Sequence, residues 1–170
     1  MKKILIFGNS GSGKSTLAAK LSASDNLAHL DLDTLAWKPT TPPERESLDI
    51  SRVKIEDFIS KNSNWVVEGC YSDLLEIVCS ELTEIIFLNL PVELCIENAR
   101  NRPWEPHKYN SKEAQDKNLN MLINWLSEYT NRNDEFSFTS HINFYDAFLG
   151  KKSMIKHNAK NTFQRHEMNS

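Results

Sequence analysis

Residues 4–17, which read "ILIFGNSGSGKSTL", place a short apolar run directly before small residues, a lysine and two hydroxyls. Residues 8–15 match the pattern G-x-x-x-x-G-K-[ST] at every fixed position. The glycines let the backbone turn so that successive N–H groups point inward at an anion. The helix that follows adds its partly positive N-terminus. The stretch therefore predicts a phosphate-binding loop between a buried strand and a helix.

The loop also predicts which residues bind a nucleotide. Lys14 can reach the β- and γ-phosphates, and the Ser15 hydroxyl can bind Mg²⁺. The residues expected to bind the nucleotide are Gly8, Asn9, Ser10, Gly11, Ser12, Gly13, Lys14, Ser15 and Thr16. A nucleoside triphosphate and Mg²⁺ are thus the expected ligands.

The composition narrows the class of protein. A chain of 170 residues fits one domain. Its formal net charge of −3 argues against nucleic acid as the main partner, although a local basic patch remains compatible with that sum. The three cysteines lack metal-site spacing and are expected to be reduced thiols. Because no apolar stretch reaches about 18 residues, we expect a cytoplasmic protein without a membrane partner.

Strand and helix patterns alternate along the chain, which predicts βαβ units and a parallel sheet. Strands are expected at residues 2–7, 27–32, 65–68, 84–90 and 152–156. Helices are expected at residues 14–21, 51–61, 73–80, 92–101 and 140–149, with a further helix that begins near Asn110 and has Glu113 in a capping box. Ligands of such sheets bind at the carboxyl ends of the strands.

Carboxylates follow two of these strands. Asp31 and Asp33 are two residues apart, so we expect their side chains to leave the same side of the chain. One would hold a metal-bound water and the other would orient or deprotonate an acceptor hydroxyl. Glu68 ends the "WVV" strand and can orient Mg²⁺ through water. The structural alternatives are that Asp33 caps the next turn and that Glu68 caps the helix near Ser72.

Arginines flank the proline-bracketed loop at residues 102–109. Arg100 and Arg102 could close over the negative charge of a transferring phosphoryl group, or they could simply complement the end of a helix. Arg132, after the next helix, is a weaker candidate. Trp37 and Trp104 could stack on a base, with a core or rim role as the alternative.

The whole chain resembles the small P-loop kinases related to adenylate kinase, and within them the bacterial group labelled adenylate kinase-related or DNA topology modulation kinase-like. The phosphate-binding loop, "HLDLDTLAWKP" at residues 29–39 and "WVVEGCY" at residues 65–71 carry the resemblance. It implies an α/β fold, the P-loop NTPase three-layer α/β/α sandwich with a five-stranded parallel sheet. The kinase-like domain would span residues 1–156, with a helical lid at about 100–117 and a polar tail at 157–170.

The resemblance also implies Mg²⁺-dependent transfer of the ATP γ-phosphoryl group to a small-molecule acceptor, for which a nucleotide is one candidate. The catalytic residues would be Lys14, Asp33, Arg100 and Arg102, and the metal would be held by Ser15 and, through water, by Glu68 and Asp31. In adenylate kinases the third-strand motif continues into a proline and an arginine that grips the acceptor phosphate. Here Cys70 and Tyr71 follow, so the acceptor class stays open.

Two other functions fit the same residues. One is a nucleotide-binding and hydrolysing regulatory module that acts with nucleic acid. The other is a kinase of RNA or DNA ends, against which the net negative charge counts because phosphate tracking needs a basic surface.

Overall fold

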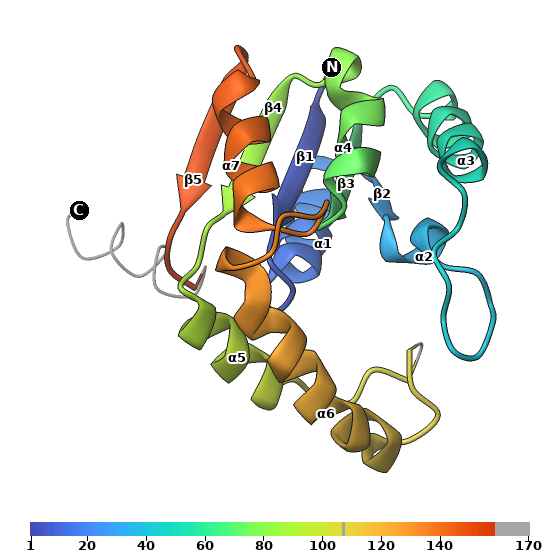
Figure 1. The fold of residues 1–170 in the computed structure, drawn as a ribbon. Coiled ribbons are helices and arrows are strands. Elements are labelled where there is room, and N and C mark those ends of the chain that lie inside the picture. Colours follow the sequence, from blue (N-terminus) through green and yellow to red (C-terminus); the bar gives the residue numbers. More distant parts are fainter. Residues whose placement is uncertain (107, 159–170) are drawn as a thin grey trace.

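A computed structural model describes residues 1–106 and 108–158 of the protein. Its centre is a five-stranded parallel sheet with the strand order β2-β3-β1-β4-β5 (Figure 1). The strands are β1 (Lys3–Gly8), β2 (Ala28–Asp31), β3 (Trp65–Gly69), β4 (Glu84–Leu88) and β5 (Lys151–Ile155). The predicted five-stranded parallel sheet is confirmed.

Helices cover both faces of the sheet. They are α1 (Lys14–Asp25), α2 (Asp33–Ala36), α3 (Leu48–Lys61), α4 (Ser72–Val78), α5 (Val92–Arg100), α6 (Lys112–Ser127) and α7 (Phe138–Ala147), with 3₁₀ turns η1 (Cys79–Glu81) and η2 (Glu128–Thr130). The pattern of β1 explains the layers. Ile4 and Ile6 join the core on the α1 and α5 side, whereas Leu5 and Phe7 join the core on the α3, α4 and α7 side. A strand buried on both faces reads as a continuous apolar run.

Three helices begin earlier or later than predicted for one shared reason. The side chains of Ser47, Ser111 and Ser137 accept hydrogen bonds from backbone N–H groups and act as N-caps of α3, α6 and α7. The N-cap of α6 is Ser111 rather than the predicted Asn110, because the Ser111 hydroxyl accepts a hydrogen bond from the Ala114 N–H at 3.1 Å. A serine hydroxyl satisfies one of the free N–H groups at a helix start.

The remaining boundaries differ by a few residues. β2 ends at Asp31 rather than at residue 32, and α1 continues to Asp25 before Asn26 turns into the left-handed region at φ 52°. Within the part of the chain that the structure describes, no helix combines the length and apolarity that a membrane crossing requires. Residues 159–170 of the predicted tail, and residue 107 of the predicted lid, lie outside the described residues.

Candidate functional site

The phosphate-binding loop connects the central strand of the sheet to α1. β1 pairs with β3 on one side and with β4 on the other, so the loop leaves the middle of the carboxyl edge. α1 begins at Lys14, directly after Gly13, whose φ is 89°. The free N–H groups at the start of a helix favour an anion here.

Two positions of the loop require or tolerate glycine for different physical reasons. A Cβ at Gly11, which has φ 73°, would lie 2.5 Å from the backbone carbonyl oxygen of Cys95 on α5. Asn98 of the same helix donates its Nδ2–H to the carbonyl of Gly11 at 2.9 Å. At Gly13 a Cβ would meet nothing within 4 Å. Packing against α5 therefore requires Gly11, while Gly13 borders open space in which an anion has room.

The polar side chains of the loop differ in what they face. Lys14 donates from Nζ to the backbone carbonyl of Asn9 at 2.9 Å, so it folds back over the loop. The buried hydroxyl of Ser12 has no hydrogen-bond partner, and Ser15 is exposed on the first turn of α1. The buried Asn9 amide contacts the carbonyl of Leu126 at 3.4 Å. The role of Asn9 in nucleotide binding stays a prediction, and its side chain is buried against α6.

Two carboxylates lie side by side beyond the loop. Asp31 on β2 and Glu68 on β3 are register partners in the sheet. Glu68 is only 1% exposed, and its Oε1 atom has no hydrogen-bond partner. The Nε2 atom of the His29 ring lies 3.7 Å from that oxygen. Burial raises the pKa of the Asp31 carboxyl to about 6, and the charges of Glu68 and Asp33 add to this shift.

Asp33 does not share the strand geometry that we predicted. It begins α2, and its backbone N–H donates to Oδ1 of Asp31 at 2.9 Å. Asp31, rather than Asp33, therefore caps the following turn. Glu68 does not cap α4 either, because the N–H of Ser72 donates to the carbonyl of Glu135 at 2.9 Å. Both capping alternatives were wrong.

The Asp33 carboxylate is held from two directions. The Tyr71 hydroxyl donates to its Oδ1 at 2.5 Å and in turn accepts from Trp37 Nε1 at 2.8 Å. Lys108 of the predicted lid lies 3.5 Å from Oδ2. Sequence reasoning missed Tyr71 as a partner of Asp33, although its place as the last residue of the "WVVEGCY" motif was a usable signal.

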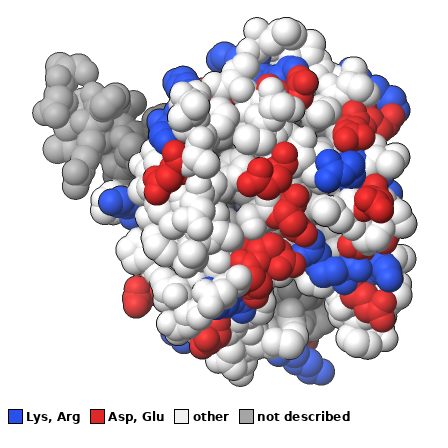
Figure 2. Space-filling view, turned by 45° about the horizontal axis from the view of Figure 1, so that its top comes forward, with Lys and Arg blue, Asp and Glu red and all other residues white. Residues whose placement is uncertain are grey.

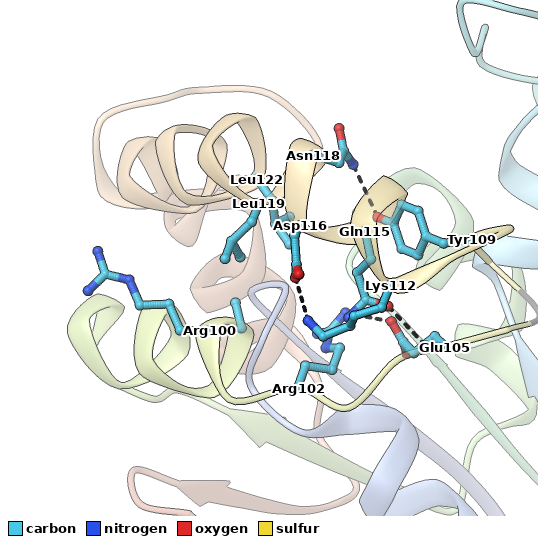
Figure 3. Close-up of a pocket in the computed structure, with 11 residues that line it drawn as sticks. Arg100, Arg102, Glu105, Tyr109, Lys112, Gln115, Asp116, Asn118, Leu119 and Leu122 are labelled. Carbon is cyan, nitrogen blue, oxygen red and sulfur yellow. Dashed lines mark hydrogen bonds and ion pairs between the residues drawn. The ribbon is translucent and has the colours of Figure 1, made fainter.

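The predicted lid is tied to α6 by one amide (Figure 3). Gln115 accepts from the N–H of Glu105 at 2.9 Å and donates to the carbonyl of Pro103 at 3.1 Å. Arg102 donates to the Glu105 carboxylate at 3.2 Å. Arg100 is exposed at the end of α5, and Figure 3 shows its guanidinium pointing away from Arg102. The structure thus brings Arg102 and Lys108 to one loop, and leaves Arg100 outside it.

The sequence profile of the AAA domain family matches residues 4–118, which include the phosphate-binding loop and most of the predicted lid. The chain belongs to this AAA domain family. A curated relative, "Uncharacterized protein YqaC" of Bacillus subtilis (strain 168), is 30% identical over 135 residues, which cover 76% of this chain and 74% of the relative.

Solved structures place this AAA domain chain among the P-loop kinase folds. Shikimate kinase from Acinetobacter baumannii in complex with shikimate matches with a TM-score of 0.54 at 16% identity, covering 100% of this chain and 95% of that one. Shikimate kinase from Bacteroides thetaiotaomicron gives 0.53 at 15% identity, with 99% and 97% covered. Deoxyadenosine kinase from M.mycoides with bound dATP gives 0.50 at 14% identity, with 99% and 100% covered.

These comparisons show an AAA domain with a P-loop kinase-like fold. The narrower resemblance to the adenylate kinase-related or DNA topology modulation group stays a prediction.

Two remaining candidate residues of this AAA domain chain contact other parts of the protein. The guanidinium of Arg132 lies 4.3 Å from the centre of the Trp125 ring, and its Nε is 3.7 Å from Asp134. The indole N–H of Trp104 donates to the carbonyl of Tyr109 at 3.0 Å, which is a hydrogen bond within the predicted lid.

Proposed function

We propose that the protein is an ATP-binding, Mg²⁺-dependent phosphotransferase that moves the γ-phosphoryl group to a small acceptor. One arrangement carries this proposal. The phosphate-binding loop with Lys14 lies at the same edge of the sheet as two neighbouring carboxylates, and Asp33 begins the next helix along that edge. An anion site, a cation site and a candidate base thus occur together, which is the set that phosphoryl transfer needs.

The carboxylates fit a divalent cation. Glu68 keeps a buried oxygen without a hydrogen bond, and Asp31 beside it has a pKa raised to about 6 by burial and by nearby negative charge. The two side chains offer neighbouring carboxylate oxygens, and Mg²⁺ prefers oxygen ligands and keeps several waters. Ser15 directly, and Glu68 and Asp31 through water, would hold Mg²⁺, which supplies charge neutralisation on the phosphoryl oxygens.

The protein side chains take separate roles in this proposal. Lys14, now bonded to its own loop, would turn to the phosphates when they bind. Asp33, oriented by the Tyr71 hydroxyl, would accept a hydrogen bond from the acceptor hydroxyl and take its proton. Arg102 would bring positive charge over the transferring group from the lid. Arg100 would join it only if its side chain rotated inward.

Transfer from ATP labelled at the γ-phosphate tests the proposal. Lys14→Ala should lower the rate of labelled product formation at least about a thousandfold, because it removes the charge that follows the γ-phosphate. Lys54→Ala, at an exposed position of α3, is the matched control and should keep the wild-type rate. A near-normal rate from Lys14→Ala would refute the mechanism.

The same assay separates the alternative of a regulatory module. Release of free labelled phosphate, with no labelled acceptor from a broad panel of nucleotides, sugars and cyclic acids, would favour nucleotide hydrolysis. A nucleic-acid partner has little electrostatic support, since the net charge is −3 and the face in Figure 2 carries carboxylates near its centre rather than a continuous basic surface.

A further inference from the structure

We infer that the acceptor is an uncharged, ring-bearing hydroxyl compound of the nucleoside or sugar class, rather than a compound carrying a phosphate or carboxylate. This inference rests on the proposed phosphotransferase function and specifies its acceptor. It comes from the cations near Asp33, each of which already has a carboxylate beside it.

The residue that contacts Asp33 most closely is neutral. The Tyr71 hydroxyl donates its only hydrogen bond to the Asp33 carboxylate and accepts one from the indole N–H of Trp37. The phenol therefore fixes the carboxylate without offering positive charge to a ligand. An acceptor that approaches Asp33 from this side meets hydrogen-bonded aromatic groups.

Both terminal nitrogens of the arginine nearest to this group are paired with carboxylates. Arg45 lies over the Tyr71 ring, with 4.9 Å from its guanidinium carbon to the ring centre. Its Nη1 is 2.7 Å from Glu135 and its Nη2 is 2.9 Å from Asp73, while Nε is buried without a hydrogen-bond partner. The guanidinium also lies 5.3 Å from the centre of the Phe136 ring. To grip an anionic acceptor, Arg45 would have to abandon two carboxylates and leave both unpaired.

The cations of the lid are engaged as well. Lys108 lies 3.5 Å from Asp33 and 3.8 Å from Glu105, and Arg102 is 3.2 Å from the same glutamate. Among the described residues that contact Asp33 or Tyr71, each cation thus faces at least one carboxylate. Asp31 on β2, its register partner Glu68 on β3 and the adjoining Asp33 place three carboxylates at this edge of the sheet. A second anion brought to this side would be repelled.

The exposed groups near Asp33 can bind a neutral ring compound through a hydrogen bond and a ring contact. Its hydroxyl can donate to Asp33, which is 44% exposed at its side chain, and its ring can lie against Trp37, which is 40% exposed. In the step itself, the acceptor oxygen bonds to the γ-phosphorus as the bond to the β–γ bridging oxygen breaks. ADP leaves, and the hydroxyl proton passes to Asp33.

Matched acceptor pairs test the inference on the wild-type protein. Labelled ATP is offered with deoxyadenosine or dAMP, adenosine or AMP, and glucose or glucuronate, and kcat/KM is measured for each. We expect a neutral member to exceed its anionic partner at least about tenfold. Equal or higher values for the anionic members would overturn the inference and leave the proposed function standing. If no neutral compound is labelled, the inference also fails, and equilibrium dialysis with ATP and Mg²⁺ then shows whether the phosphate site itself is at fault.

A double variant tests the cause. Asp73→Asn with Glu135→Gln releases Arg45 from its two carboxylates, and we expect the anionic-to-neutral ratio of kcat/KM to rise at least about threefold. Asp49→Asn with Glu56→Gln, at exposed positions of α3, is the charge-matched control. A ratio that is the same in both double variants would contradict the role assigned to the Arg45 pairing.

Discussion

Gly11→Ala should mainly lower the stability of the protein, whereas Gly13→Ala should mainly weaken nucleotide binding. In Gly11→Ala the new methyl group would lie 2.5 Å from the Cys95 carbonyl oxygen on a backbone with φ 73°. The left-handed conformation costs about 1–2 kcal/mol for a residue with a Cβ, and overpacking costs about 1–3 kcal/mol. We therefore expect the free energy of unfolding to fall by about 2–5 kcal/mol.

In Gly13→Ala the free energy of unfolding should fall only by the conformational cost. Its φ of 89° is also left-handed, but the methyl group would meet no protein atom within 4 Å. We expect a loss of about 1–2 kcal/mol. Because the methyl group would project into the space available to an anion at the start of α1, affinity for ATP should fall at least tenfold, or about 1.4 kcal/mol.

Urea unfolding and equilibrium dialysis measure the two effects. With a slope of about 2 kcal/mol per molar urea, the extra 1–3 kcal/mol in Gly11→Ala corresponds to a midpoint about 0.5–1.5 M below that of Gly13→Ala. Coinciding midpoints would refute the assignment of Gly11 to packing against α5. Normal ATP binding by Gly13→Ala would refute the assignment of Gly13 to the anion site.

Three further outcomes are expected. Because the folded pKa of Asp31 is about 6, above its ordinary value, the metal-free protein should lose stability as pH rises from about 4 to 6; Asp31→Asn should remove this loss in thermal melts, and an unchanged profile would contradict it. Burial lowers the pKa of His141 to about 4, so its contribution should be present above about pH 6.5 and be lost as pH falls toward 4; the difference in melting temperature between wild type and His141→Asn should narrow over that range, and a constant difference would argue against a neutral buried ring. Gln115→Met should speed trypsin cleavage after Lys108 at least about threefold, because the loop loses both hydrogen bonds to Gln115; equal cleavage rates would show that this amide does not restrain the loop.

Much of the architecture could be read from local patterns. The continuous apolar run before Gly8 predicted a strand buried on both faces, and β1 is that strand. The alternation of strands and helices predicted the parallel sheet. The ends of β2, β4 and α1 differ from the prediction by a few residues, and α2 was not predicted. Three helix starts also differ, and Ser47, Ser111 and Ser137 each decide the boundary through one side-chain hydrogen bond. Many serines make no such bond, so their identity alone does not locate a cap.

The sequence predicted which residue types line the candidate site, but it did not predict which side chains contact one another there. Spacing alone suggested that Asp31 and Asp33 act from one side of a strand, but the chain enters α2 between them and gives them different neighbours. Asp31 faces Glu68 across the sheet, and Asp33 faces Tyr71. Neither pairing has a signature in local sequence, because each joins segments that are more than thirty residues apart.

The amino-acid sequence by itself determined the phosphate-binding loop, because the backbone path around an anion depends on a few adjacent residues whose allowed conformations are local properties. Tertiary structure alone decided which charges are left over for a ligand. Arg45 and Lys108 look like free cations along the chain, and the fold sets each against a carboxylate from another segment, whereas Arg102 pairs locally with Glu105. The electrostatic character of the acceptor side is a sum over neighbours in space, and only the folded chain defines those neighbours.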